Sequence, residues 1–182
     1  MDEKIPFRGL LAQIEEGGHI QRNHLVSEPF ILLVDDDKDW LFLSRVQLVK
    51  AGVTHTVTEA RDGEEAIFVC SSSLQRGAIP LFVLLDINMP RVSGFEVLEW
   101  IRAEPRLDEV PIIVLSSSQL EADVFRAKTL GADAFLAKGD NVASFSALYR
   151  ESKAIGAARS NPAKPLADLP GNLLSPFTFE LE

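Results

Sequence analysis

Five polar residues that follow apolar segments of the chain could together carry phosphoryl chemistry. Asp35 and Asp36 directly follow one apolar run, and Asp86 directly follows a second. Ser116 and Lys138 end two further segments of strand-like character. If these segments are parallel strands of one sheet, their carboxyl ends meet at one edge, where ligands bind in such folds. The sequence therefore predicts that acids, a hydroxyl and an ammonium converge at one site.

The acidic run Asp35–Asp37 indicates a cation site. Two carboxylates 4 Å apart repel by roughly 4 kcal/mol at an effective dielectric constant near 20. A bound cation relieves that repulsion, and oxygen ligands completed by waters suit Mg²⁺. Capping of the next helix would explain one of these acids. It would not explain Asp86, which ends a different strand, so we favour the metal site.

Asp86 is the candidate nucleophile of this set. A carboxylate can attack phosphorus and form an acyl phosphate. Phosphoryl transfer depends mainly on positioning and on neutralising the charge of the phosphoryl oxygens. The metal would supply two positive charges, Lys138 a third as a mobile point charge, and Ser116 a hydroxyl donor. The combination predicts a reversible phosphate carrier.

The elements that must position these residues alternate between strands and helices. Apolar runs typical of strands buried on both faces lie at 30–34, 81–85 and 111–115, with weaker strand candidates at 53–58 and 133–137. Helical patterns lie at 38–51, 63–75, 92–103, 119–130 and 141–157. This order predicts an α/β fold, a flavodoxin-like, doubly wound five-stranded parallel sheet of (βα)5 type.

Local signals mark several of the expected helix ends. Asp62 with Glu65, and Ser118 with Glu121, have the spacing of capping boxes. Gly52 is expected to end the first of these helices. These signals place helix ends next to the strand ends that carry the candidate site.

Two segments flank the expected main domain at 29–158. We expect residues 1–28 to form an extension with a possible short helix. Residues 159–182 are proline-rich and are expected to form a tail with a possible terminal strand. This tail is too short and too rich in proline for an output domain, so we expect output by partner binding or self-association.

Composition narrows the function classes. The net charge of −9 and the absence of a basic stripe argue against nucleic-acid binding. The one cysteine, Cys70, lies in an apolar stretch and is expected to be buried in a reducing compartment. No signal peptide or membrane-length apolar run is visible, so we expect a cytoplasmic protein without membrane contact.

With these residues in view, the chain resembles the receiver domains of response regulators in two-component signalling. The resemblance covers roughly residues 29–157. The matching segments are 30–37, 83–90 together with Gly94, 111–117 and 131–138. One departure is Gly139, which stands where the family usually has a proline in a cis peptide bond.

The resemblance implies roles for the acidic residues. Asp86 would be the phosphoacceptor. Asp35 and Asp36 would bind Mg²⁺, with Asp36 and Asp86 as direct ligands. Asn88 would contribute its backbone carbonyl to the metal.

The resemblance also implies a switch. Ser116 would be the hydroxyl that moves towards the phosphoryl group, and Lys138 would pair with a phosphate oxygen. Phe135 would be the aromatic residue whose rotamer reports activation. Such a switch biases an existing equilibrium.

The implied partner is a sensor histidine kinase or a histidine phosphotransfer protein. A homodimer is a further expectation, because some stand-alone receivers, including those serving bacterial and cyanobacterial phytochromes, dimerise. The protein would not be an enzyme in the usual sense, since it would catalyse only its own phosphorylation and dephosphorylation.

Three alternatives stay open at this stage. A degenerate receiver could act as a scaffold without phosphorylation. A dehalogenase-type phosphatase would share the aspartate, Mg²⁺, hydroxyl and lysine, but its Asp-x-Asp-x-(Thr/Val) motif is not matched at 35–39. A flavodoxin-like cofactor binder would need a phosphate-cradling loop where three aspartates stand.

Overall fold

The computed structural model describes residues 28–117 and 120–138 of the 182-residue chain. The predicted helices near the N-terminus and at 141–157, the terminal strand and Gly139 lie outside the described residues. The predicted limits of the main domain therefore stay predictions. Within the described part, no helix has both the length and the hydrophobicity of a membrane span.

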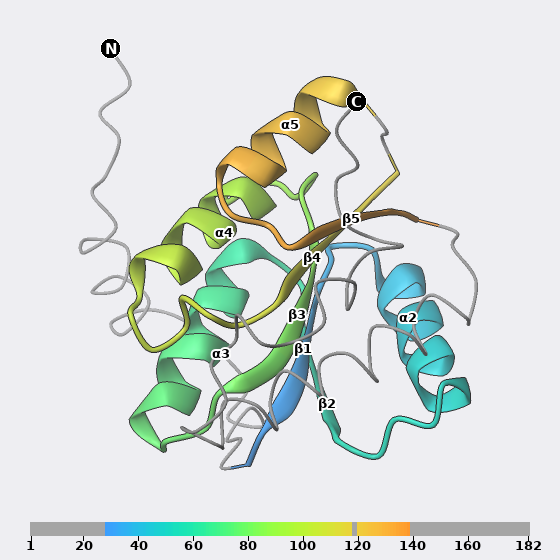
Figure 1. Cartoon of the computed structure of the whole chain (residues 1–182). Helices are drawn as coiled ribbons and strands as arrows, with labels where there is room; N and C mark the ends of the chain where they lie inside the picture. The colour runs from blue at the N-terminus through green and yellow to red at the C-terminus, as the bar shows by residue number, and fades with distance from the viewer. Residues whose placement is uncertain (1–27, 118–119, 139–182) are drawn as a thin grey trace, which may run out of the picture.

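The described chain folds around a five-stranded parallel sheet (Figure 1). Its strand order is β2-β1-β3-β4-β5, the order of flavodoxin-like doubly wound folds. This confirms the predicted fold class. The strands are β1 (Phe30–Val34), β2 (Thr56–Ala60), β3 (Pro80–Asp86), β4 (Ile112–Ser116) and β5 (Ala134–Ala137).

Helices cover both faces of the sheet, as Figure 1 shows. On one face α3, α4 and α5 pack against a large apolar cluster. On the other face α2 packs against a second cluster, and it is the only helix there within the described ranges. The helices are α2 (Lys38–Lys50), α3 (Gly63–Gln75), α4 (Gly94–Ala103) and α5 (Glu121–Thr129).

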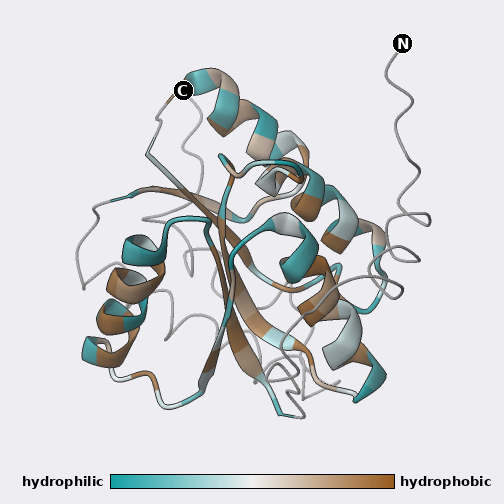
Figure 2. Ribbon diagram, turned by 180° about the vertical axis from the view of Figure 1, so that it is seen from behind, coloured by the Kyte–Doolittle hydropathy of each residue, from teal (hydrophilic) through white to brown (hydrophobic). Residues whose placement is uncertain are grey.

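The apolar strands owe their sequence to this two-sided burial. Successive side chains of a strand point to opposite faces, so a strand between two helical layers is apolar at every position. All five residues of β1 are buried, with Phe30 and Leu32 in one cluster and Ile31 and Leu33 in the other. Figure 2 shows the hydrophobic colouring concentrated along the central strands. In β3 and β4 the polar residues Asp86 and Ser116 stand at the carboxyl ends of the strands.

The helix ends confirm some of the predicted signals and correct others. Gly52 adopts φ +81° directly after the C-cap of α2, as predicted. Asp62 caps α3 by accepting from the Glu65 N–H at 2.8 Å. The predicted Ser118 and Glu121 capping box is wrong, because α5 begins at Glu121 with Leu120 as its N-cap. Ser118 itself lies outside the described residues.

Candidate functional site

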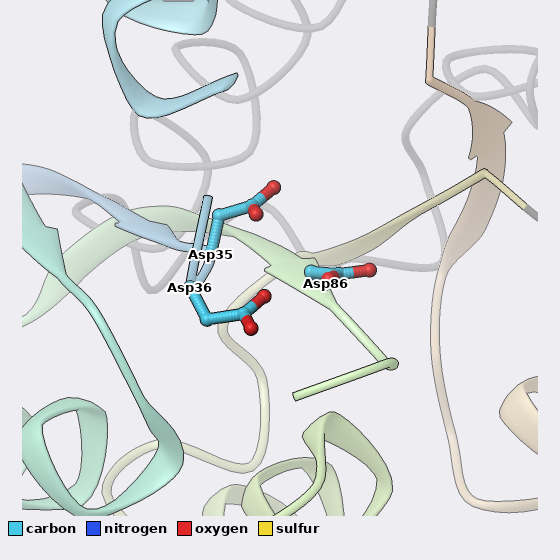
Figure 3. A group of neighbouring side chains, drawn as sticks. All are labelled: Asp35, Asp36 and Asp86. Carbon is cyan, nitrogen blue, oxygen red and sulfur yellow. The ribbon is translucent and has the colours of Figure 1, made fainter. Parts of the chain in front are cut away.

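The carboxyl ends of β1 and β3 bring three carboxylates together. These strands are neighbours in register, with Val34 opposite Leu85, so the residues that follow Val34 lie beside Asp86. One oxygen from each of Asp35, Asp36 and Asp86 lies within 4.8 Å of the others. Figure 3 shows the three side chains extending to the same side of the sheet edge.

The three acids differ in burial, and burial affects how readily a carboxyl group ionises. Asp35 is 4% exposed and Asp86 is 2% exposed, whereas Asp36 is exposed. Burial raises the pKa of Asp35 above its usual value, because water no longer solvates its charge. Hydrogen bonds from Lys138 and the Asp37 N–H lower that pKa in part, and the nearby Asp86 raises it.

Lys138 supplies a positive charge to this cluster. It directly follows β5, and its backbone N–H donates to the Ser116 carbonyl at 2.8 Å. Its Nζ lies 2.7 Å from Asp35 Oδ2 and 3.2 Å from Asp86 Oδ2. Burial alone would lower the pKa of Lys138, but the two carboxylates together raise it above the usual value. The ammonium is therefore held in its charged form.

The cluster is short of positive charge and of hydrogen-bond donors. The ammonium of Lys138 pairs with two of the three clustered carboxylates, and Asp86 Oδ1 is buried without a hydrogen-bond partner. Leaving a buried acceptor unpaired costs about 1–3 kcal/mol, more for a charged group. A hard divalent cation with oxygen ligands would meet both deficits. The residues present therefore fit Mg²⁺ or Mn²⁺.

Ser116 and Asn88 lie next to these acids. Ser116 ends β4, the strand beside β3, and its side chain is fully buried. Asn88, two residues after Asp86, donates from Nδ2 to Ser116 Oγ at 3.3 Å. This side-chain hydrogen bond connects the loop after β3 to the end of β4.

Phe135 differs from the other predicted residues in that it does not stand at or beyond the end of a strand. It occupies the interior of β5, opposite Val114 of β4. Its side chain is partly buried against the core cluster beneath α3, α4 and α5. A change in the position of the Phe135 ring would therefore alter its packing against this cluster.

Two features of the site were not predicted. The Lys138 Nζ lies 5.7 Å from the centre of the Trp40 ring, within the range of a cation–π contact. Ser93 and Glu96 form a reciprocal capping box at the start of α4. The Ser93 and Glu96 spacing was a visible signal, whereas nothing in the sequence pairs Trp40 with a lysine 98 positions away (138 − 40).

Comparison with known proteins places this geometry in a family. The family model described as "Response regulator receiver domain" matches residues 31–148. Response regulator Rcp1 of Synechocystis is 32% identical over 114 residues, which cover 62% of this chain and 78% of Rcp1. The gliding motility regulatory protein of Myxococcus xanthus is 37% identical over 113 residues, 60% of this chain but only 13% of that protein.

Solved structures that resemble this chain are also response regulators. The bacteriophytochrome response regulator AtBRR aligns with a TM-score of 0.57 and 35% identity, over 70% of this chain and 90% of AtBRR. The Mn²⁺-bound form of Rcp1 aligns with a TM-score of 0.55 and 29% identity, over 74% of this chain and 96% of that one. The fold is thus that of known response regulators.

Proposed function

The chain belongs to the response regulator receiver family, and on that premise we propose that Asp86 is its phosphoacceptor. The donor would be a phosphohistidine of a sensor histidine kinase or a histidine phosphotransfer protein. The observation that carries the proposal is the buried, unpartnered Oδ1 of Asp86 beside two other acids and Lys138. An unsatisfied buried oxygen at a charged site is typical of a group that reacts or binds an ion.

Asp35, Asp36 and Asp86 would hold Mg²⁺, together with the backbone carbonyl of Asn88. When bound, Mg²⁺ neutralises charge on the phosphoryl oxygens. The Mn²⁺ in the related Rcp1 structure supports a divalent cation of this kind. Asp36 is suited to direct binding because it is exposed and approaches from the solvent side.

The side chains of the chain perform the transfer. A carboxylate oxygen of Asp86 attacks phosphorus as the P–N bond of the phosphohistidine breaks, and the bonding electrons return to the imidazole nitrogen. Lys138 is already 3.2 Å from Asp86 Oδ2 and would pair with a phosphoryl oxygen. Ser116, whose Oγ accepts from Asn88 Nδ2, would donate its hydroxyl to another oxygen.

The movement of Ser116 would be the start of the signal. As Ser116 turns towards the phosphoryl group, Phe135 on the adjacent strand β5 would change its packing. Output would then follow through a partner or a homodimer. Catalysis would be limited to the protein's own phosphorylation and dephosphorylation.

The test is phosphorylation by a small-molecule phosphodonor, followed by intact mass spectrometry with and without Mg²⁺. We expect wild type to gain one phosphoryl group only with Mg²⁺, and Asp86→Asn to gain none. Asp39→Asn is the matched control, because it removes one exposed charge near the site and should react like wild type. An unmodified wild type would favour the scaffold alternative, and a modified Asp86→Asn would assign the phosphoryl group elsewhere.

A further inference from the structure

The loop between β3 and α4, residues 87–93, is closed tightly at its base. A Cβ added at Gly94 would lie 2.0 Å from the carbonyl oxygen of Asp86. The Gly94 N–H donates to the Ile87 carbonyl at 3.3 Å. The first residue of α4 therefore sits directly on the backbone of the proposed phosphoacceptor, and only glycine fits there.

The tip of the same loop is held in an unfavourable backbone conformation. Arg91 has φ +67°, and it is the only non-glycine residue with positive φ in the described chain. The left-handed region is unfavourable for an ordinary L-residue, because its Cβ comes too close to the following carbonyl oxygen. Contacts made by Arg91 must offset that cost. Its guanidinium pairs with Asp62 Oδ2.

Asp62 contacts two structures at once. Its Oδ1 accepts from the Glu65 N–H at 2.8 Å and caps α3, while its Oδ2 accepts from the Arg91 guanidinium. At the next residue, a Cβ added to Gly63 would lie 2.5 Å from Val92 Cγ1 and 2.6 Å from the Val92 carbonyl oxygen. The beginning of α3 and the tip of the loop thus meet by an ion pair and by close backbone packing.

We infer that Asp62 and Arg91 are positioning residues for the metal site, an inference that rests on the proposed function. The pair fixes the tip of the loop, Gly94 fixes its base, and Asn88 lies between them. The loop conformation sets where the Asn88 carbonyl points and keeps the Asn88 amide at Ser116. Losing the pair would let Asn88 move and weaken metal binding without removing any ligand.

The test is a Mg²⁺ titration followed by tryptophan fluorescence, to which Trp40 contributes beside Lys138. Asp62→Asn removes the charge but keeps a good N-cap. Arg91→Asn removes the guanidinium but tolerates the left-handed backbone. We expect each variant to bind Mg²⁺ roughly 10-fold more weakly than wild type. The double variant should be no weaker than either single variant, because both break one interaction.

A second ion pair in the chain offers a matched control. Glu104 and Arg106 pair at 2.8 Å with side-chain exposures of 24% and 59%, close to the 23% and 62% of Asp62 and Arg91. They follow α4, at the end of the helix that lies away from Gly94. Glu104→Gln and Arg106→Gln make the same charge changes and should leave Mg²⁺ affinity at the wild-type value.

The outcomes separate the two proposals. If wild type binds no Mg²⁺, the proposed function fails and the inference fails with it. If wild type binds Mg²⁺ and both loop variants bind as the controls do, only the inference fails. A second readout needs no metal: amide hydrogen exchange in residues 87–93 should be faster in both loop variants, with exchange in the central strands unchanged. Unchanged exchange in the loop would also overturn the inference.

Discussion

The two ends of the parallel sheet both hold charged groups, but the hydrogen-bonding needs of these groups are met differently. At the amino ends of β4 and β5, Arg102 is the centre of a closed network. Its guanidinium donates to the Asp133 carboxylate at 2.8 Å. It also donates, at 2.7–2.9 Å, to the backbone carbonyls of Gly131, Asp108 and Val110. Asp133 Oδ2 also accepts from the Ile112 N–H at 2.7 Å. This network fastens α4 to the strands.

At the carboxyl ends the network stays open. Lys138 pairs with Asp35 and Asp86, yet Asp86 Oδ1 has no partner and three acids share one corner. A structural polar cluster and a functional one in the same sheet therefore differ in whether the folded chain alone satisfies their polar groups. The first is complete in the folded chain, whereas the second needs a ligand to complete it.

The largest effect on stability should come from the closed network. Arg102→Met removes four hydrogen bonds of the guanidinium and should lower the free energy of unfolding by about 2–4 kcal/mol, measured by urea denaturation. Mg²⁺ affinity of the folded variant should not change. Arg106→Gln, at an exposed pair nearby, should unfold like wild type. Equal unfolding of both variants would erase the proposed contrast between the two ends.

The open network should gain stability from its ligand. Mg²⁺ at 100 times its Kd should raise the free energy of unfolding by about 2.7 kcal/mol, because only the folded state has the site. Asp36→Asn should lose this gain, and Arg102→Met should keep it. A gain of equal size in Asp36→Asn would show that Mg²⁺ acts elsewhere on the chain.

The variant Lys138→Met tests how the positive charge of the ammonium affects Mg²⁺ binding in the open network. Without the ammonium, Mg²⁺ no longer competes with a positive charge 2.7 Å from Asp35, so binding should tighten about tenfold, or about 1.4 kcal/mol. Phosphorylation should slow in the same variant, because a partner of the phosphoryl oxygens is lost. Weaker Mg²⁺ binding in Lys138→Met would contradict this electrostatic account.

The same variant makes a prediction about pH. Burial raises the pKa of Asp35, and the hydrogen bond from Lys138 opposes that rise. Removing Lys138 should let the pKa of Asp35 rise further. Because Mg²⁺ needs the deprotonated carboxylate, its affinity should begin to fall at a higher pH in Lys138→Met than in wild type as the solution is acidified. Fluorescence titrations at several pH values measure this displacement.

Much of this site could be predicted because it depends on strand ends. Apolar runs that stop at Asp35, Asp86 and Ser116 fix both the strands and the polar edge, since parallel strands end together. The chemistry of that edge follows from residue type. The predicted helix at 141–157 and the homodimer stay predictions.

Contacts between distant segments could not be predicted in the same way. The Arg91 and Asp62 pair depends on a left-handed residue in a loop, which no periodic pattern marks. The predicted helix began at residue 119, whereas α5 begins at Glu121. Residues with capping-box spacing can occur where the helix is not capped by them. Such details depend on tertiary packing rather than on local sequence.

An anomalous difference map from a crystal grown with Mn²⁺, which takes the same oxygen ligands as Mg²⁺, tests whether the ends of β1 and β3 share a metal site. We expect one peak within bonding distance, roughly 2 Å, of carboxylate oxygens of Asp36 and Asp86 and of the Asn88 carbonyl oxygen. A peak at another place, or none at the corner shared by β1 and β3, would contradict the account.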